Sequence, residues 1–239
     1  MVSDLHSHIL PGIDDGSPSV EESIAMLRME AEQGVTRVVA TPHFYPLHDD
    51  PLSFLEKRAH SEQMLRQEME KHTGLPSLTV GAEVFFFRGM SESDILPQLT
   101  IGRKGYILIE MPPAPWPESY FQELEAIWAR WRILPIIAHI DRYIGPLRTF
   151  KIPERLSRLP VFVQANADFF LSWRTASMAY GMLGNGQIQL LGSDCHDRTE
   201  RKPNLGAAVK NIERKLGSDV LSVICECEHR IFDSESLVF

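Results

Sequence analysis

The stretch Ser19-Val-Glu-Glu-Ser-Ile-Ala-Met-Leu-Arg-Met-Glu-Ala-Glu-Gln-Gly-Val-Thr-Arg-Val-Val-Ala40 predicts a helix that leads directly into a buried strand. Ser19 can cap the helix, and Glu22 completes a capping box. Apolar residues then recur at spacings of three and four up to Gly34, which suits the residue just past a helix end. The β-branched run Val35–Ala40 predicts a short buried strand.

The same alternation of helix and strand continues along the chain. Besides Val35–Ala40, we expect strands at Val2–His8, Ser77–Glu83, Tyr106–Glu110, Pro135–His139, Val161–Asn166 and Gln187–Asp194. Helical character lies between them, at Leu52–His72, Glu118–Trp131, Ser172–Leu183 and Asn204–Lys215. Strands that alternate with helices are parallel and build an α/β layer architecture. Seven such strands suit a distorted (β/α)7 TIM-like barrel, although alternation alone also allows a doubly wound sheet.

Length and composition restrict the class of protein. The 239 residues show no internal break, so we expect one α/β domain over residues 1–239. The net charge of −8 argues against nucleic acid or an anionic membrane as the main partner. There is no signal-peptide pattern and no apolar run of about 18 residues. Three poorly spaced cysteines favour a reducing compartment, so a cytoplasmic location is expected, whereas the oligomeric state stays open.

Metal-ligand residue types stand at or just beyond the ends of six of the seven expected strands. In chain order they are His6 and His8, His43, Glu83, Glu110, His139, then Asp194 with His196, while the sixth strand ends in the amide Asn166. The carboxyl ends of parallel barrel strands open on one face, which is where barrel enzymes carry their active sites. A single such residue is usually only hydrogen-bonded or solvated, but this recurrence predicts a shared site for Zn, Mn or Fe.

The motifs around these residues resemble those of a known family. The opening Asp4-Leu-His-Ser-His-Ile-Leu-Pro-Gly-Ile-Asp-Asp-Gly16 resembles the first motif of the PHP (polymerase and histidinol phosphatase) superfamily. More narrowly, the chain is similar to bacterial PHP-type protein-tyrosine-phosphatases associated with capsule and exopolysaccharide synthesis. The further motifs are Ala40–His43, Gly81–Glu83, Ile107–Glu110, Ile137–His139 with Arg142-Tyr143, and Gly192–His196. They span nearly the whole chain in the family's order.

The resemblance implies a (β/α)7 barrel of the PHP fold with up to three divalent ions, usually manganese, although Fe, Zn or Co would suit the same ligand types. The implied metal ligands are His6, His8, Asp15, His43, Glu83, Glu110, His139, Asp194 and His196. The Asp14-Asp15 pair leaves the register ambiguous, and Asp15 is preferred because it precedes the glycine. Arg142 and Arg201 would hold phosphate, and Asp194 or His196 would protonate the leaving phenolate.

This chain departs from the family pattern at two motifs. Ile140-Asp141 replaces the usual Pro-Glu before Arg142, and Cys195 and Asp197 flank His196 where the family usually has Ala and Asn. No implied ligand is lost, so the departures bear on phosphate and peptide contacts rather than on metal binding.

The resemblance implies a hydrolase that removes phosphate from phosphotyrosine in protein, with a metal-bound hydroxide attacking phosphorus. Its partner would be a bacterial tyrosine autokinase that regulates capsule or exopolysaccharide synthesis. The aromatic run Phe85–Phe87 and Trp116 are candidates for the wall against the substrate ring, although core packing is at least as good an explanation of Phe85–Phe87. One alternative is a histidinol-phosphate or other small-molecule phosphatase of the same superfamily. Another is a non-enzymatic regulatory barrel that has kept the fold, but the loss of several ligands would be expected of such a protein, and none is missing here.

The sequence also contains a spacing that is typical of cysteine-dependent phosphatases. Cys195 and Arg201 have the spacing of the loop used by cysteine-dependent phosphatases, in which a thiolate attacks phosphorus. The five residues between them contain no glycine for a phosphate-binding turn and include two acids. The spacing is therefore interpreted as chance.

Overall fold

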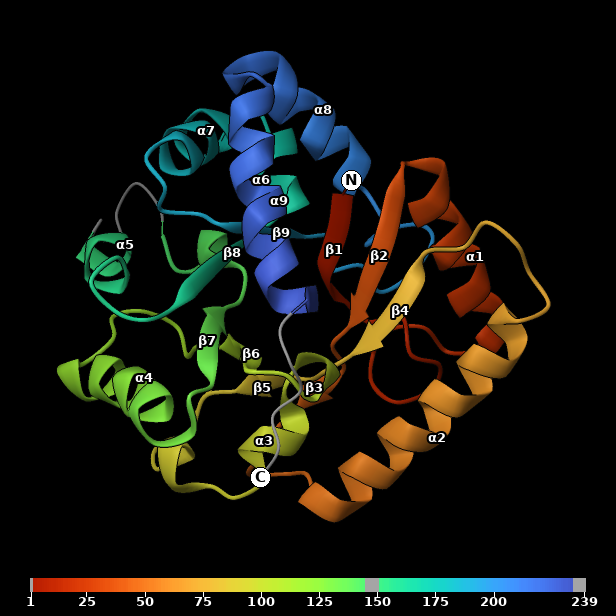
Figure 1. Ribbon diagram of the computed structural model, residues 1–239, viewed down its shortest axis with the longest axis horizontal. Coiled ribbons are helices and arrows are strands. Elements are labelled where there is room, and N and C mark those ends of the chain that lie inside the picture. The colour runs from red at the N-terminus through yellow and green to blue at the C-terminus, as the bar shows by residue number, and fades with distance from the viewer. Residues whose placement is uncertain (1, 145–150, 234–239) are drawn as a thin grey trace.

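The computed structural model describes residues 2–144 and 151–233, so residues 1, 145–150 and 234–239 of the expected 1–239 domain lie outside its description. All strand pairings in the described residues are parallel. One sheet has the order β1-β2-β4, and the other has the order β3-β5-β6-β7-β8-β9 (Figure 1). The strands are β1 (Val2–Ser7), β2 (Val35–Ala40), β3 (His43–Phe44), β4 (Ser77–Val80), β5 (Glu83–Phe85), β6 (Tyr106–Glu110), β7 (Leu134–Ile137), β8 (Phe162–Asn166) and β9 (Leu190–Gly192).

Backbone hydrogen bonds join the two sheets into a ring. On one side the chain itself runs from β2 into β3 and from β4 into β5, and hydrogen bonds from Gly81 N to Ala40 O (2.9 Å) and from Glu83 N to Pro42 O (3.0 Å) keep the two lines paired across the break. On the other side, Asp194 N donates to His6 O (2.8 Å) and His8 N donates to Cys195 O (2.9 Å). Counting β2 with β3 and β4 with β5, the described strands follow seven lines around a distorted barrel, which confirms the predicted (β/α)7 architecture.

The predicted strand Ser77–Glu83 was wrong as one element, because the chain divides it between β4 and β5, in different sheets. The break falls at Gly81, where a Cβ would lie only 3.1 Å from the Ile101 side chain. Arg58 donates from Nη1 to the Gly81 carbonyl (2.9 Å), so a side chain takes the place of a ladder partner there. The bend turns Glu83 toward the middle of the barrel mouth.

Helices surround the strands (Figure 1). The longer ones are α1 (Val20–Glu32), α2 (Pro51–Met69), α4 (Glu118–Trp131), α7 (Ala176–Gly184), α8 (Leu205–Leu216) and α9 (Ser218–Asp233). The short helical segments are the 3-10 helices η1 (Met90–Glu92), η2 (Ile101–Arg103) and η3 (Ile140–Arg142) and the α-helices α3 (Leu96–Leu99), α5 (Lys151–Leu156) and α6 (Ala167–Leu171). The predicted cap of α1 is present, since Ser19 Oγ accepts from Glu22 N (3.2 Å). No helix within the described residues is long and apolar enough to cross a bilayer.

Helix α9, which the sequence reading did not predict, closes the end of the barrel away from the carboxyl ends of the strands. Figure 1 shows it crossing in front of the ring of strands. Its Ile231 is fully buried and packs in one cluster with Leu5 and Leu108 from two strands. Glu228 accepts from Ser3 N (3.4 Å), near the start of β1. The apolar interior is thus sealed at this end, which leaves the opposite mouth for polar groups.

Candidate metal centre

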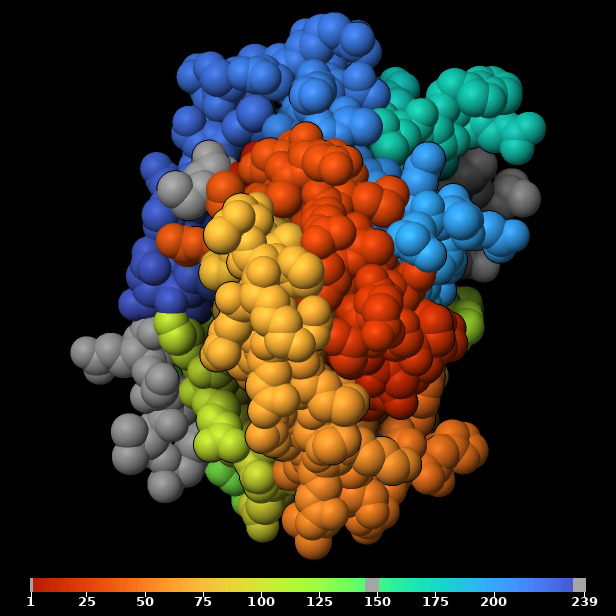
Figure 2. Space-filling model, turned by 90° about the vertical axis from the view of Figure 1, so that its right-hand side faces the viewer, coloured from red at the N-terminus to blue at the C-terminus, as the bar shows by residue number. Residues whose placement is uncertain are grey.

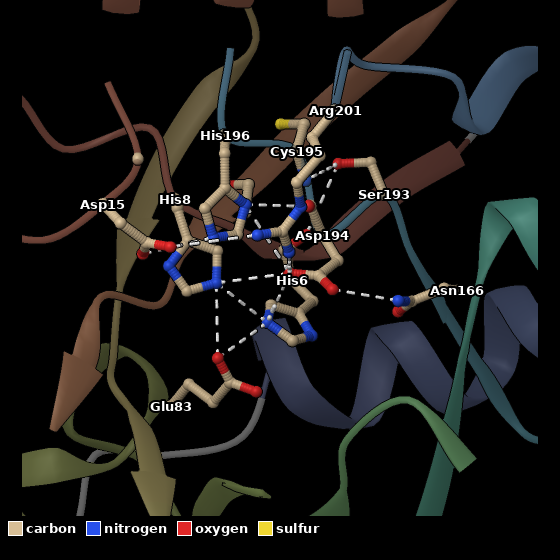
Figure 3. A network of polar contacts seen from close by, with 12 residues as sticks. His6, His8, Asp15, Glu83, Asn166, Ser193, Asp194, Cys195, His196 and Arg201 are labelled. Carbon is tan, nitrogen blue, oxygen red and sulfur yellow. Dashed lines mark hydrogen bonds and ion pairs between the residues drawn. The ribbon is translucent and has the colours of Figure 1, made fainter. Parts of the chain in front are cut away.

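Four imidazoles surround the carboxylate of Glu83 at the carboxyl ends of the strands. Glu83 Oε2 lies 3.2 Å from His6 Nε2, 3.3 Å from His8 Nε2 and 3.0 Å from His43 Nδ1. The other oxygen, Oε1, lies 2.8 Å from His139 Nε2. Figure 3 shows the His6 and His8 rings pointing toward Glu83, His6 from β1 and His8 from just past its end. Glu83, His6, His8 and His139 are buried, so these groups meet away from bulk water.

Asp194 completes the opposite side of this cluster. Its Oδ1 lies 3.5 Å from His6 Nε2 and 3.4 Å from His8 Nε2, and Asn166 Nδ2 donates to its Oδ2 (3.0 Å). Asp194 and His139 both have positive φ, 54° and 32°, which is unfavourable for residues with a Cβ. Strained backbone of this kind collects at functional sites, where the surrounding structure holds a side chain in place.

The donor atoms form three overlapping groups, in each of which all atoms lie within 4.8 Å of one another. Two of them share His8 and two share His43, so neighbouring ions could be bridged. The groups are His8 with Asp15, His43 and His196; His6 with His8 and Asp194; and His43 with Glu83 and Glu110. His, Asp and Glu together are ligands for Zn, Mn and Fe.

Unsatisfied buried atoms show that this donor set fits cations. Glu83 Oε2, His43 Nδ1 and His196 Nε2 have no hydrogen-bond partner among the described residues, although they lie beside other polar atoms. A buried polar atom without a partner carries a large desolvation cost, so such atoms are rare in native proteins. Divalent ions at these positions would give each atom a partner.

The electrostatics of the site agree with this interpretation. Burial alone would raise the pKa of Glu83, but His6, His139 and His43 hold that pKa well below its usual range. Burial alone would lower the pKa of His8, yet hydrogen bonds to acids outweigh it and raise the pKa well above its usual value. The pKa of His6 is raised as well, so without cations, protons on His6 and His8 offset the carboxylate charge. Metal ions bind deprotonated ligands, so they would displace these protons.

The adjacent acids Asp14 and Asp15 occupy different positions. Asp14 is largely buried, and its Oδ2 lies 2.8 Å from His8 Nδ1 and accepts from His43 N (3.0 Å). Burial alone would raise the pKa of Asp14, but the contact with His8 outweighs it and lowers this pKa to about 2. Asp15 is 65% exposed, with Oδ1 3.4 Å from His196 Nε2 and 3.5 Å from His43 Nε2. Asp15 thus lies on the donor-atom side, whereas Asp14 supports the ring of His8 from behind.

Replacing Asp14 by Asn is expected to lower metal affinity by about 10- to 100-fold, the usual cost of losing a carboxylate behind a ligating histidine. The physical reason is that Asp14 fixes the His8 ring with Nε2 facing the cluster. Metal titration of D14N followed by mass spectrometry of bound metal measures the effect. Asp219→Asn, an exposed acid on α9, is the matched control. Wild-type metal affinity in D14N would contradict the supporting role of Asp14.

Two arginines lie at the mouth of the cluster. Arg142 and Arg201 both donate to Asp194, Arg201 at 2.9 Å from Nη2 to Oδ1. Arg142 Nη1 also lies 3.8 Å from Glu110, and Arg201 Nη1 lies 4.0 Å from Asp15. Both side chains are more than 40% exposed, at 43% and 41%. A planar guanidinium can hold two oxygens of a phosphate, so the pair is placed to bind an anion at the cluster.

A model of the family described as capsular polysaccharide synthesis, CpsB/CapC, matches residues 2–232. The chain belongs to the CpsB/CapC family. Putative tyrosine-protein phosphatase CapC of Staphylococcus aureus is 32% identical over 218 residues, covering 83% of this chain and 78% of that protein. Tyrosine-protein phosphatase CpsB of Streptococcus agalactiae is 25% identical over 227 residues, covering 90% and 91%. Tyrosine-protein phosphatase YwqE of Bacillus subtilis is 27% identical over 240 residues, covering 93% and 88%.

Solved structures show the same fold. A crystal structure from work on YwqE of B. subtilis and CpsB of Streptococcus pneumoniae, described as unique metal-dependent tyrosine phosphatases, superposes with a TM-score of 0.84 at 20% identity. The alignment covers 99% of this chain and 96% of that one. Histidinol phosphate phosphatase of Lactococcus lactis, complexed with Zn, L-histidinol and phosphate, gives a TM-score of 0.57 at 12% identity, covering 90% and 94%.

In this CpsB/CapC chain the barrel brings together the nine proposed metal ligands and the two proposed phosphate-binding arginines. One supporting residue was not anticipated. Gln164 Oε1 accepts from His139 N (2.7 Å) and lies 3.3 Å from His6 Nδ1. Its Nε2 donates to Asn166 (3.0 Å). The sequence could have indicated this role, because residues 164 and 166 lie on the same face of a predicted strand, so Gln164 points to the same side as Asn166.

The aromatic wall expected from the sequence is only partly at the site. Trp116 is buried, at 8% exposure, and donates from Nε1 to Pro112 O (2.8 Å), so it is part of the core and not a rim residue. Phe86 is also buried. Phe85 instead lies beside Tyr45, which was not anticipated, with ring centroids 5.9 Å apart. Tyr45 in turn stacks on the His43 ring at 5.1 Å and is 37% exposed, so an aromatic surface does adjoin the cluster.

Proposed function

We propose that this chain is a metal-dependent protein-tyrosine-phosphatase that acts on a bacterial tyrosine autokinase in capsule or exopolysaccharide synthesis. The observation that carries the proposal is the overlap of three donor groups beside two arginines, Arg142 and Arg201, that both contact Asp194. The names of the CpsB/CapC relatives support the reaction and the process. We infer a cytoplasmic location from the cysteine pattern.

The ligands we propose are His6, His8, Asp15, His43, Glu83, Glu110, His139, Asp194 and His196, with manganese as the preferred ion. Divalent ions held there would bind phosphoryl oxygens, lower the pKa of water and neutralise the leaving oxygen. Arg142 and Arg201 would turn from Asp194 toward the incoming phosphate and orient it for in-line attack. Burial and the nearby His8 lower the pKa of His196 to about 4, so its ring is neutral at pH 7 and suits a metal ligand better than a proton donor to the leaving phenolate. The Tyr45 and Phe85 rings would lie against the substrate ring.

The test combines metal analysis of the purified protein with assays of a phosphotyrosyl peptide and of histidinol phosphate, each with and without chelator. We expect turnover of the peptide that chelation abolishes and manganese restores. Turnover of histidinol phosphate alone would reject the substrate, and full activity after complete metal removal would reject the mechanism.

Cys195→Ser and Cys195→Ala are both expected to keep roughly wild-type kcat/KM. Cys195 is fully buried, and burial together with Glu30 and Asp4 raises the pKa of its thiol well above the usual value. Such a thiol stays protonated and is a poor nucleophile. Steady-state assays with a phosphotyrosyl peptide check this. Loss of turnover in both variants, with metal content intact, would instead favour thiolate chemistry.

A further inference from the structure

A cavity of about 430 Å³ lies on the outside of the barrel, between α2 and the edge formed by β4 and η2. Figure 2 shows this face, with α2 in orange beside the yellow-green residues that precede β6. The side chains around the cavity include four cations, Arg58, Arg66, Arg103 and Lys104, and one carboxylate, Glu62. No candidate metal ligand lines it. A concentration of positive charge is unexpected on a chain whose net charge is −8.

Arg58 is a buried cation without an ionic partner. It is 9% exposed, and it donates only to carbonyl oxygens, Gly81 O at 2.9 Å and Gln98 O at 2.7 Å. It forms no ion pair with any carboxylate in the described residues. Burial lowers the pKa of Arg58 to about 10, with Glu62 opposing this shift and Arg103 adding to it. Buried charges are normally paired, so an anion in the cavity would supply the missing partner.

Arg103 is held over the same cavity at the expense of backbone strain. Its φ is 57°, directly after Gly102 at 60°, and the left-handed region is unfavourable for a residue with a Cβ. Its exposed side chain has no hydrogen bond or ion pair with the described residues. Arg66, by contrast, is neutralised by Glu62 at 2.7 Å. An unpaired arginine kept in a strained conformation beside a buried one indicates a function other than stability.

We propose that this cavity, which we call the basic cavity, is a second phosphate site that binds a small phosphorylated molecule. Guanidinium groups bind phosphate through paired, charge-assisted hydrogen bonds. Arg58 would supply the buried charge at the base and Arg103 the exposed fork at the rim. The volume is within the range of small-molecule pockets, so it accommodates more than the phosphate group. This site is independent of the metal centre and of the reaction proposed there.

The experiment is calorimetric titration of the full, metal-loaded chain with inorganic phosphate and, separately, with glucose 6-phosphate. The substitutions R142A and R201A are introduced first to weaken binding at the metal centre. In that background we expect weakened binding at the metal centre that Arg103→Asn leaves unchanged, and a second site that Arg103→Asn weakens about tenfold through loss of a charge-assisted contact. Arg132→Asn is the matched control, because Arg132 is also exposed and left-handed, at φ 55°, but lies away from the cavity.

Asparagine tolerates the left-handed conformation, so R103N is also expected to raise the melting temperature, which separates lost binding from lost folding. Binding of both probes in an Arg103-dependent way supports recognition of the phosphate group alone. Binding of glucose 6-phosphate only supports recognition of the attached sugar as well. Binding of neither, or equal effects of R103N and R132N, would overturn the proposal.

Discussion

Replacing Glu83 by Gln is expected to lower kcat/KM for a phosphotyrosyl peptide on the order of 10³-fold, as loss of a central electrostatic group does in other enzymes. Glu83 places one charged carboxylate within 3.3 Å of His6, His8 and His43. The glutamine side chain has the same shape but no charge. One of its two terminal atoms is an NH₂ group, which cannot accept a hydrogen bond or bind a metal ion as a carboxylate oxygen does. We therefore expect metal content to fall together with turnover, measured by mass spectrometry and steady-state kinetics.

The control for Glu83→Gln is Glu125→Gln, an exposed glutamate on α4. Circular dichroism and melting temperature distinguish loss of metal from loss of fold. Near-normal metal content and turnover in E83Q would show that Glu83 is a neutral or dispensable member of the cluster, and the proposed metal centre would then be wrong.

Replacing Arg142 by Ala should have the second largest effect, a fall in kcat/KM of about 10²- to 10³-fold with metal content unchanged. Arg142 already makes contact with Asp194, so its guanidinium reaches the cluster from η3. We expect Arg142→Lys to recover only a small part of the activity, because an ammonium group cannot offer two parallel donors to phosphate. Single-turnover and steady-state assays across substrate concentrations separate the effects on binding and on turnover.

Arg174→Lys and Arg174→Ala provide the matched control for Arg142, since Arg174 is exposed and contacts the ring of Trp173. A full recovery of kcat/KM in R142K would mean that charge alone matters at this position. Unchanged activity in R142A would remove Arg142 from the phosphate-binding group.

Local signals explain why much of the fold was predictable. The predicted spans of β2, β6 and α4 agree with the structure to the residue. β2 and β6 are short runs of apolar and β-branched residues, α4 has apolar residues at spacings of three and four, and Gly34 gives a clear boundary before β2. The missed helix α9 also had a signal, because Ile224, Cys227 and Ile231 follow helical spacing. The missed strand β3 did not, since two residues are too few to show any period.

The sequence by itself determined the order of strands and helices and which residues end the strands, because helix caps, apolar periodicity and parallel pairing are local or nearly local rules. From those rules a gathering of histidines and acids at one mouth followed directly. Only the tertiary structure decided that Asp14 lies behind His8 while Asp15 faces the donor atoms. It also placed Trp116 in the core and Tyr45 at the site. These outcomes depend on burial and side-chain direction, which are set by contacts between segments far apart in the chain.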